Sequence, residues 1–259
     1  MLLALDAGNT EITVGLFRGD ALSGQWRLTT DSARTPDEWS IALGAFLLHA
    51  GHSPNEVKAA IIASVAPGVT ESLSEGVRRL TGATVHSVTA TSELPITLDV
   101  DEPLTVGADR IVNTLAAMNR FASDTIVVDF GTATTFDCIT GDGRFMGGVI
   151  MPGLRTSADQ LSRRAAKLPA TELRPPERVI GRRTEECIRA GVLLGTAEAV
   201  DGLVRRIKGE WPTGRVPRVI ATGRLAGVIV PLTTTIDEVV PDLTLQGLRL
   251  AAAHLGVRW

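Results

Sequence analysis

The most constraining feature of this sequence is an internal repeat at a spacing of 123 residues. Residues 5–10, Leu-Asp-Ala-Gly-Asn-Thr, align on residues 128–133, Val-Asp-Phe-Gly-Thr-Ala. With the same shift Leu16 falls on Ile139, and a turn rich in Gly and Asp recurs after the second apolar run. Each half therefore starts with the pattern of strand, Asp-x-Gly turn, strand, turn and third strand. Such a repeat near the midpoint of 259 residues predicts an internal duplication.

Hydrophobic periodicity predicts an α/β protein with two domains. Apolar runs bounded by turn residues predict strands at 2–5, 12–17, 23–29, 59–65, 85–88, 125–130 and 218–221, and helical spacing predicts helices at 35–48, 69–80, 107–118, 183–207 and 242–255. Three prolines predict a loop or flap within residues 169–181. We expect domains at residues 1–117 and 118–259, with the option that the final helix packs back on the first domain.

Composition restricts the function classes. Hydrophobic residues make up 44% of the chain and charged residues 21%, which is typical of a packed core. The net charge is −3 without a basic or acidic block, so we expect no nucleic-acid partner and no membrane association. No apolar run reaches the roughly 18 residues of a membrane span. The absence of Tyr excludes Tyr-based catalysis. Two Cys are too few for a disulfide scaffold, so we expect a soluble cytoplasmic protein.

Two Asp-x-Gly turns stand at equivalent places of the repeat, one starting at Asp6 and the other at Asp129. Glycine lets the backbone approach a ligand closely, and the N–H groups of a tight turn converge on a concavity that suits phosphate oxygens. The two carboxylates suit Mg²⁺ or another hard cation. Either turn alone fits an ordinary strand connection equally well, but two at symmetric positions favour phosphate binding between the halves. Neither has the glycine spacing of a Rossmann or a Walker loop.

Two further motifs carry charged residues. Residues 107–110, Gly-Ala-Asp-Arg, are predicted to start a helix, where Arg110 could hold a carboxylate ligand and Asp109 could accept a proton. The alternative is an ordinary acid at a helix start beside a solvated arginine. Residues 222–224, Thr-Gly-Arg, follow a predicted strand and fit a nucleotide contact or a simple turn equally well. The four histidines show no metal-ligand spacing.

Six motifs, in this order along the chain, resemble those of type III pantothenate kinases. They are Asp6-x-Gly8-Asn9-Thr10, Gly107-x-Asp109-Arg110, Asp129-x-Gly131-Thr132-Ala133-x-Thr135, Gly147-Gly148-x-Ile150-x-Pro152-Gly153, Ile180-Gly181-x-x-Thr184 and Leu245-x-Gly247-Leu248. The resemblance runs nearly end to end. It implies two RNase H-like domains in the duplicated α/β fold of the actin/hexokinase/Hsp70 (ASKHA) superfamily. It also implies ATP-dependent phosphorylation of pantothenate to 4′-phosphopantothenate, the first step of coenzyme A biosynthesis, by a homodimer that uses Mg²⁺ and a monovalent cation, K⁺ or NH₄⁺.

The same resemblance implies roles for individual residues. The implied ATP-binding residues are Asp6, Ala7, Gly8, Asn9, Thr10, Glu11, Ile12, Thr13 and Thr132, with Asp6 near Mg²⁺ through phosphate or water. Asp129 is implied as the ligand of the monovalent cation. The implied pantothenate site comprises Gly107, Ala108, Asp109, Arg110 and Thr184. Within it, Asp109 is the implied catalytic residue, which accepts the proton of the primary hydroxyl, and the pocket is implied to lie near the subunit interface.

Three positions depart from the usual pattern of that family. Val100 stands where Tyr is common, Arg183 where Asn is usual, and Arg224 where a second Gly is usual. These changes favour one alternative function, a catalytically weak or inactive homologue with a regulatory or partner-binding role. A second alternative is another small-molecule kinase or a phosphohydrolase, since a fold alone does not set function. Residues 107–110 argue against a hydrolase, which needs an acid that orients water.

Overall fold

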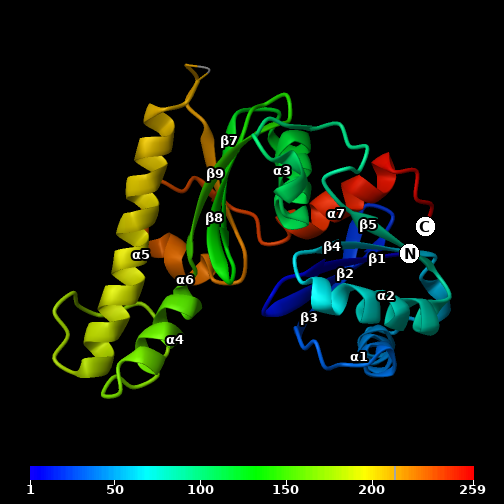
Figure 1. Ribbon diagram of the computed structural model, residues 1–259, viewed down its shortest axis with the longest axis horizontal. Coiled ribbons are helices and arrows are strands. Elements are labelled where there is room, and N and C mark those ends of the chain that lie inside the picture. The colour runs from blue at the N-terminus through cyan, green and yellow to red at the C-terminus, as the bar shows by residue number, and fades with distance from the viewer. Residues whose placement is uncertain (213) are drawn as a thin grey trace. The chain divides into compact units, whose positions relative to one another are not determined.

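The computed structural model describes residues 1–212 and 214–259 (Figure 1). The chain divides into two compact units, one formed by Met1–Asn119 together with Leu243–Trp259 and the other by Arg120–Asp242. The division falls two residues after the boundary expected at residue 117, and the last helix belongs to the first unit. Among the described residues, no helix is both long and apolar enough to cross a membrane.

The first unit is built on a mixed sheet with helices on both faces. The elements in this part of the chain are β1 (Leu2–Ala7), β2 (Glu11–Arg18), β3 (Ala21–Thr29), α1 (Pro36–His49), η1 (Pro54–Glu56), β4 (Ala59–Ser64), α2 (Pro67–Thr81), β5 (Thr84–Val88), β6 (Thr97–Leu98), η2 (Pro103–Thr105), α3 (Ala108–Phe121) and α7 (Leu243–His254). The strand order is β3-β2-β1-β4-β5, with β1 antiparallel to β2 and parallel to β4. One face packs on α1 and α2, and the other on α3 and α7.

The second unit repeats this plan. Its elements are β7 (Thr125–Phe130), β8 (Ala133–Ile139), β9 (Arg144–Pro152), α4 (Leu154–Arg164), α5 (Thr184–Gly209), β10 (Arg218–Thr222), α6 (Ala226–Ile229), η3 (Val230–Leu232) and β11 (Glu238–Val239). Its strands lie in the order β9-β8-β7-β10-β11, with β7 antiparallel to β8 and parallel to β10. Apolar residues of α4, α5 and α6 cover one face of the sheet. The sequence did not predict α4, whose residues are mostly exposed and bury only Leu154 and Ala158.

The common strand order of the two sheets confirms the predicted duplication and the α/β class. The constant shift of 123 residues is wrong for the second strand of the repeat. The first turn spans residues 8–10, whereas the second spans only 131–132, so one residue is lost between the copies. Phe17 pairs with the first residue of β1 and Ile139 with the first residue of β7. The structural equivalent of Ile139 is therefore Phe17, not Leu16.

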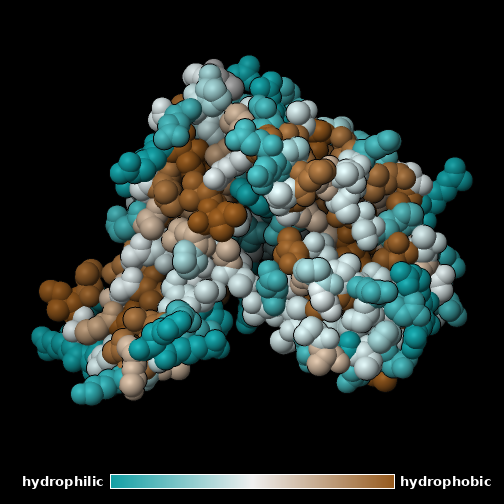
Figure 2. Space-filling view, in the orientation of Figure 1, coloured by the Kyte–Doolittle hydropathy of each residue, from teal (hydrophilic) through white to brown (hydrophobic). Residues whose placement is uncertain are grey.

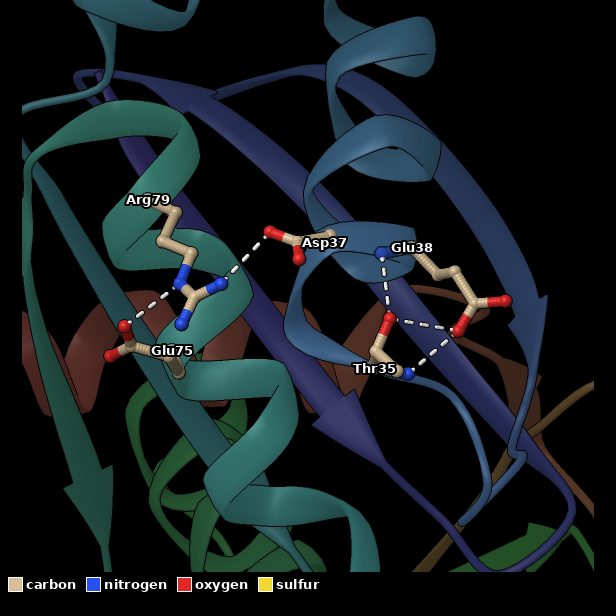
Figure 3. A network of polar contacts seen from close by, with 5 residues as sticks. All are labelled: Thr35, Asp37, Glu38, Glu75 and Arg79. Atoms are coloured by element: carbon tan, nitrogen blue, oxygen red, sulfur yellow. Dashed lines mark hydrogen bonds and ion pairs between the residues drawn. The ribbon is translucent and has the colours of Figure 1, made fainter.

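A capping box fixes the segment that connects β3 to α1. The Thr35 hydroxyl accepts a hydrogen bond from the backbone N–H of Glu38 (3.3 Å), and the Glu38 carboxylate accepts one from the N–H of Thr35 (2.8 Å; Figure 3). Arg79 of α2 forms an ion pair with Asp37 of α1 (2.8 Å), seen in the same view. An exposed ion pair stabilises little, whereas an N-cap stabilises the start of its helix. The capping box thus holds the backbone at the C-terminal end of residues 30–35.

Candidate active site

The first Asp-x-Gly turn joins β1 to β2 at the carboxyl end of β1. The N–H of Gly8 donates to the carbonyl of Glu11 (3.1 Å), and Asn9 and Thr10 are exposed. Thr30, which follows β3, contacts the turn from the other side. Its hydroxyl donates to the carbonyl of Gly8 (2.7 Å) and its N–H to the carbonyl of Thr10 (3.0 Å). The turn is thus fixed on the side of β3 and open at its tip.

Asp6 projects from the sheet face that α3 and α7 cover. It pairs in register with Thr13 on β2 and with Ala63 on β4. Directly opposed residues of paired strands project to the same face. Ala63 lies in the buried cluster that includes Ala108, the first residue of α3. The Asp6 carboxylate and the start of α3 therefore share one face of the first sheet.

The start of α3 also lies at the carboxyl end of the strands. Val65 follows β4, and its N–H donates to the carbonyl of Ala7 at the end of β1 (3.0 Å). A Cβ on Gly107 would lie 3.2 Å from Cγ1 of Val65 and 2.5 Å from Oδ1 of Asp109. Gly107 therefore makes room for the Asp109 carboxylate beside the strand ends. Ligands of open α/β sheets bind at the carboxyl ends of strands, and the structure brings Asp6, the first turn and Asp109 to that end.

The electrostatics of Asp109 suit a proton acceptor. Burial raises the pKa of the Asp109 carboxyl above its ordinary range, although the backbone N–H of Arg110 and the charge of its guanidinium oppose this rise. The N–H of Arg110 donates to Oδ1 of Asp109 (2.8 Å). A carboxylate with a raised pKa is a better general base than an ordinary aspartate. Half-buried Asp109 thus combines a fixed orientation with increased basicity.

The second Asp-x-Gly turn is held in a similar way by the segment that follows β9. The N–H of Gly131 donates to the carbonyl of Ala133 (3.0 Å). The carbonyl of Thr132 accepts hydrogen bonds from the N–H of Gly153 (3.1 Å) and from the hydroxyl of Thr156 (2.6 Å). A Cβ on Gly153 would overlap the carbonyl oxygens of Gly131 and Thr132. Only glycine permits this close approach of two backbone segments.

Asp129 lies between two threonines on the second sheet. In register it pairs with Thr135 of β8 and with Thr222 of β10, so all three project to the same face. Gly223 follows with φ of +86°, and a Cβ there would overlap Oδ1 of Asp129 and lie 2.7 Å from the backbone nitrogen of Phe130. The 222–224 motif therefore lies against Asp129, which leaves open whether it contacts a nucleotide or is a simple turn.

Thr184 is the first residue of α5, in the second unit. It is exposed and lines a groove of about 600 Å³ within the second unit. Apolar residues form much of the groove, among them Met151, Leu161, Leu168, Ile188 and Val192. Val179 and Ile180, just before α5, are 73% and 82% exposed. Figure 2 shows hydrophobic residues at the surface of this part of the molecule.

Comparison with known proteins identifies the family. A profile of type III pantothenate kinases matches residues 2–206. The chain belongs to the type III pantothenate kinase family. The type III pantothenate kinase of Thermomicrobium roseum is 44% identical over 251 residues, covering 97% of this chain and 96% of that protein. That of Syntrophotalea carbinolica is 43% identical over 250 residues, covering 96% and 97%. The family assignment suggested by the six motifs is confirmed.

Solved structures confirm the duplicated ASKHA fold of this pantothenate kinase family member. A conserved putative Baf family transcriptional activator from Campylobacter jejuni superposes with a TM-score of 0.59 at 17% identity, covering 97% of each chain. The activator of the 2-hydroxyisocaproyl-CoA dehydratase from Clostridium difficile, solved with bound ADPNP, has a TM-score of 0.57 at 14% identity, covering 98% of this chain and 92% of that one. At these identities the likeness concerns the fold alone.

The structure also locates the three departures from the usual family pattern. Val100 is half-buried in the segment before η2, and Arg183 is an exposed residue that immediately precedes α5. Arg224 directly follows the constrained Gly223. Neither Val100 nor Arg183 belongs to the Asp-x-Gly turns, and the aspartate of the 107–110 motif is present as Asp109.

Sequence reasoning missed the residues that support the two turns. Thr30 and Thr156 each donate a hydroxyl hydrogen bond to a carbonyl of a turn, but no motif singled them out. The repeat could have indicated one of these contacts, because the shift of 123 residues places Thr30 on Gly153. Both residues donate their backbone N–H to the carbonyl of the last residue of a turn, Thr10 in the first copy and Thr132 in the second.

Proposed function

We propose that this chain transfers the γ-phosphoryl group of ATP to the primary hydroxyl of pantothenate in the cytoplasm. The products are 4′-phosphopantothenate and ADP. The observation that carries the proposal is the position of Asp109 in a member of this family: a carboxylate of raised pKa at the strand ends that also carry Asp6 and the first turn. We include in the proposal that both Asp-x-Gly turns are phosphate-binding turns.

The residues divide the reaction between proton transfer and positioning. Asp109 accepts the proton of the primary hydroxyl while that oxygen forms a bond to the γ-phosphorus. The bond from the γ-phosphorus to the bridging oxygen breaks, and ADP leaves with the electron pair. Arg110 and Gly107 line the pantothenate site, and Thr184 contributes a further contact. Phosphoryl transfer depends mainly on positioning and charge neutralisation, so one carboxylate base is sufficient.

The donor atoms fit the ions that the proposal requires. Mg²⁺ prefers hard oxygen ligands and often binds through one or two carboxylates together with substrate phosphates. Asp6, beside the open first turn, fits this role. Asp129 with Thr135 and Thr222 forms a row of oxygen-bearing side chains, which fits a monovalent cation, K⁺ or NH₄⁺. When bound, the two ions neutralise phosphate charge.

We further propose that the protein is a homodimer whose interface includes the groove between α4 and α5. Its apolar lining and the exposed Val179 and Ile180 would be covered by a second copy. Leu161, 40% exposed, projects from this part of α4. Light scattering should give twice the monomer mass of 27.4 kDa for the wild type, and Leu161→Glu should shift it towards the monomer. A wild-type monomer at micromolar concentration would contradict the dimer.

A coupled assay of ADP release tests the proposed activity. ADP release should require pantothenate. It should also fall when K⁺ is replaced by Na⁺, because oxygen ligands placed for the larger K⁺ coordinate the smaller ion less well. ADP release without pantothenate would indicate a phosphohydrolase or another kinase. No release under any condition would indicate an inactive homologue. Equal rates in K⁺ and Na⁺ would remove the monovalent-cation role of Asp129 and leave the kinase activity standing.

A further inference from the structure

We infer that Thr30 and Thr156 are positioning residues for phosphate binding. Thr30 holds two carbonyl groups of the first Asp-x-Gly turn and Thr156 holds one carbonyl group of the second, so that the N–H groups of the same peptides face the opposite direction, towards a ligand. The inference rests on the proposed function, because it supposes that these turns bind phosphate. Neither threonine is one of the residues assigned to ATP or pantothenate above.

In the first unit the argument follows from the planarity of the peptide bond. In a trans peptide the carbonyl and the N–H of the next residue point in opposite directions. The hydroxyl of Thr30 donates to the carbonyl of Gly8 at 2.7 Å and so directs the N–H of Asn9 away from β3. The backbone N–H of Thr30 holds the carbonyl of Thr10 at 3.0 Å, which directs the N–H of Glu11 the same way. Two N–H groups of the turn therefore point away from the supporting strand.

In the second unit the hydroxyl of a different threonine, Thr156, also donates to a carbonyl of the turn. The carbonyl of Thr132 is held by the N–H of Gly153 (3.1 Å) and by the hydroxyl of Thr156 (2.6 Å). The N–H of Ala133 shares a peptide with that carbonyl and must point away from both donors. Gly153 allows the two segments to approach, since a Cβ there would overlap the carbonyls of the turn.

The two copies reach this arrangement from different sequence positions. Backbone donation to the turn comes from Thr30 and Gly153, which are equivalent in the repeat. The hydroxyl comes from Thr30 itself in the first unit, but in the second unit it comes from Thr156, three residues after a glycine that has no side chain to offer. The hydroxyl acceptors are not equivalent carbonyls, since they are Gly8 in the first turn and Thr132 in the second. What the two copies share is that each turn receives one backbone N–H and one threonine hydroxyl from the segment that follows its third strand.

Both hydroxyls are attached to well-fixed backbone. Thr30 begins the segment that ends in the capping box of Thr35 and Glu38 (Figure 3). Thr156 lies in the first turn of α4, where the N–H of Ser157 donates to the carbonyl of Gly153 (2.9 Å). A donor on rigid backbone orients its acceptor at little entropic cost when the ligand binds. The turns are thus preorganised before ATP arrives.

The test compares the affinities of ATP and of adenosine by titration calorimetry. Thr30→Val and Thr156→Val remove the hydroxyl and keep the branched side chain. Each should weaken ATP binding about fivefold, the effect of one neutral hydrogen bond, and leave adenosine binding unchanged, because adenosine has no phosphate. Thr30→Ser and Thr156→Ser retain the hydroxyl and should bind ATP like the wild type.

Matched controls lose the same kind of bond elsewhere. The hydroxyl of Thr81 donates to the carbonyl of Val77 (2.8 Å), and that of Thr233 to the carbonyl of Val230 (2.9 Å). Thr81→Val and Thr233→Val should leave ATP affinity unchanged, with shifts in melting temperature similar to those of the test variants. If the wild type binds ATP but both test variants bind it equally tightly, or lose adenosine in proportion, this inference alone fails. If the wild type does not bind ATP, the proposed function fails and the inference with it.

Discussion

Replacing Asp109 by Asn is expected to lower the turnover number by about 10²–10⁴-fold, the typical contribution of a general base. The amide has nearly the shape of the carboxylate but cannot accept the proton of the pantothenate hydroxyl. The glycine turns are untouched, so the affinity for ATP should stay close to that of the wild type. Single-turnover kinetics and calorimetric titration of ATP measure the two quantities separately.

The pH profile gives the same substitution a second signature. Burial raises the pKa of Asp109, so its carboxyl takes up a proton at higher pH than an ordinary aspartic acid. As the pH falls through this raised pKa, the base is lost and kcat/KM falls with it. The acidic limb of the wild-type profile should therefore lie above the ordinary aspartate range of about 3.9. The Asn variant should lack that limb.

A matched aspartate serves as the control. Asp37 lies in the first turn of α1, as Asp109 lies in the first turn of α3, but its side chain is exposed. Asp37→Asn should change neither turnover nor the pH profile. An Asp109→Asn variant that loses ATP affinity in proportion to turnover would contradict the role of base and indicate a role in nucleotide binding instead.

The sequence predicted the parts of the fold that local patterns encode. β1 and β7 are continuous apolar runs stopped by an Asp-x-Gly turn, and both were located to within two residues. The helix α4 escaped prediction because it is polar and packs through few residues. The one-residue difference between the two turns was hidden by the constant shift, since strand register is set by pairing across the sheet and not by position in the sequence.

The candidate site likewise contains residues that sequence motifs predicted and contacts that they did not. Asp6 and Asp129 stand in recognisable turns, and Asp109 in a recognisable helix start. Thr30 contacts a turn 22 residues away in sequence, and that contact exists only because β3 pairs with β2. The place of Gly223 against Asp129 likewise depends on the parallel pairing of β10 with β7. Contacts made by the sheet are not visible in any one stretch of sequence.

Gly223→Ala is expected to lower activity in K⁺ buffer to near the level found in Na⁺ buffer. The residue has φ of +86°, and the added Cβ would overlap the Asp129 carboxylate and lie 2.7 Å from the backbone nitrogen of Phe130. The backbone of Phe130 is held within the sheet, so both the Asp129 carboxylate and the backbone at Gly223 must shift. The strain and overlap should also destabilise the protein by about 1–3 kcal/mol, measured as a lower melting temperature.

Two further variants separate displacement of the carboxylate from general destabilisation. Gly227→Ala adds the same methyl group in α6, where the new Cβ would meet nothing within 4 Å beyond its chain neighbours and the backbone of its own helix, and should change neither activity nor K⁺ dependence. Asp129→Asn removes the charge without adding bulk and should reproduce the loss of K⁺ activation at nearly wild-type melting temperature. If Gly223→Ala remained folded and fully activated by K⁺, the Asp129 carboxylate would not be the group that holds the cation. The close approach of Gly223 would then serve only the packing of β10 against β7.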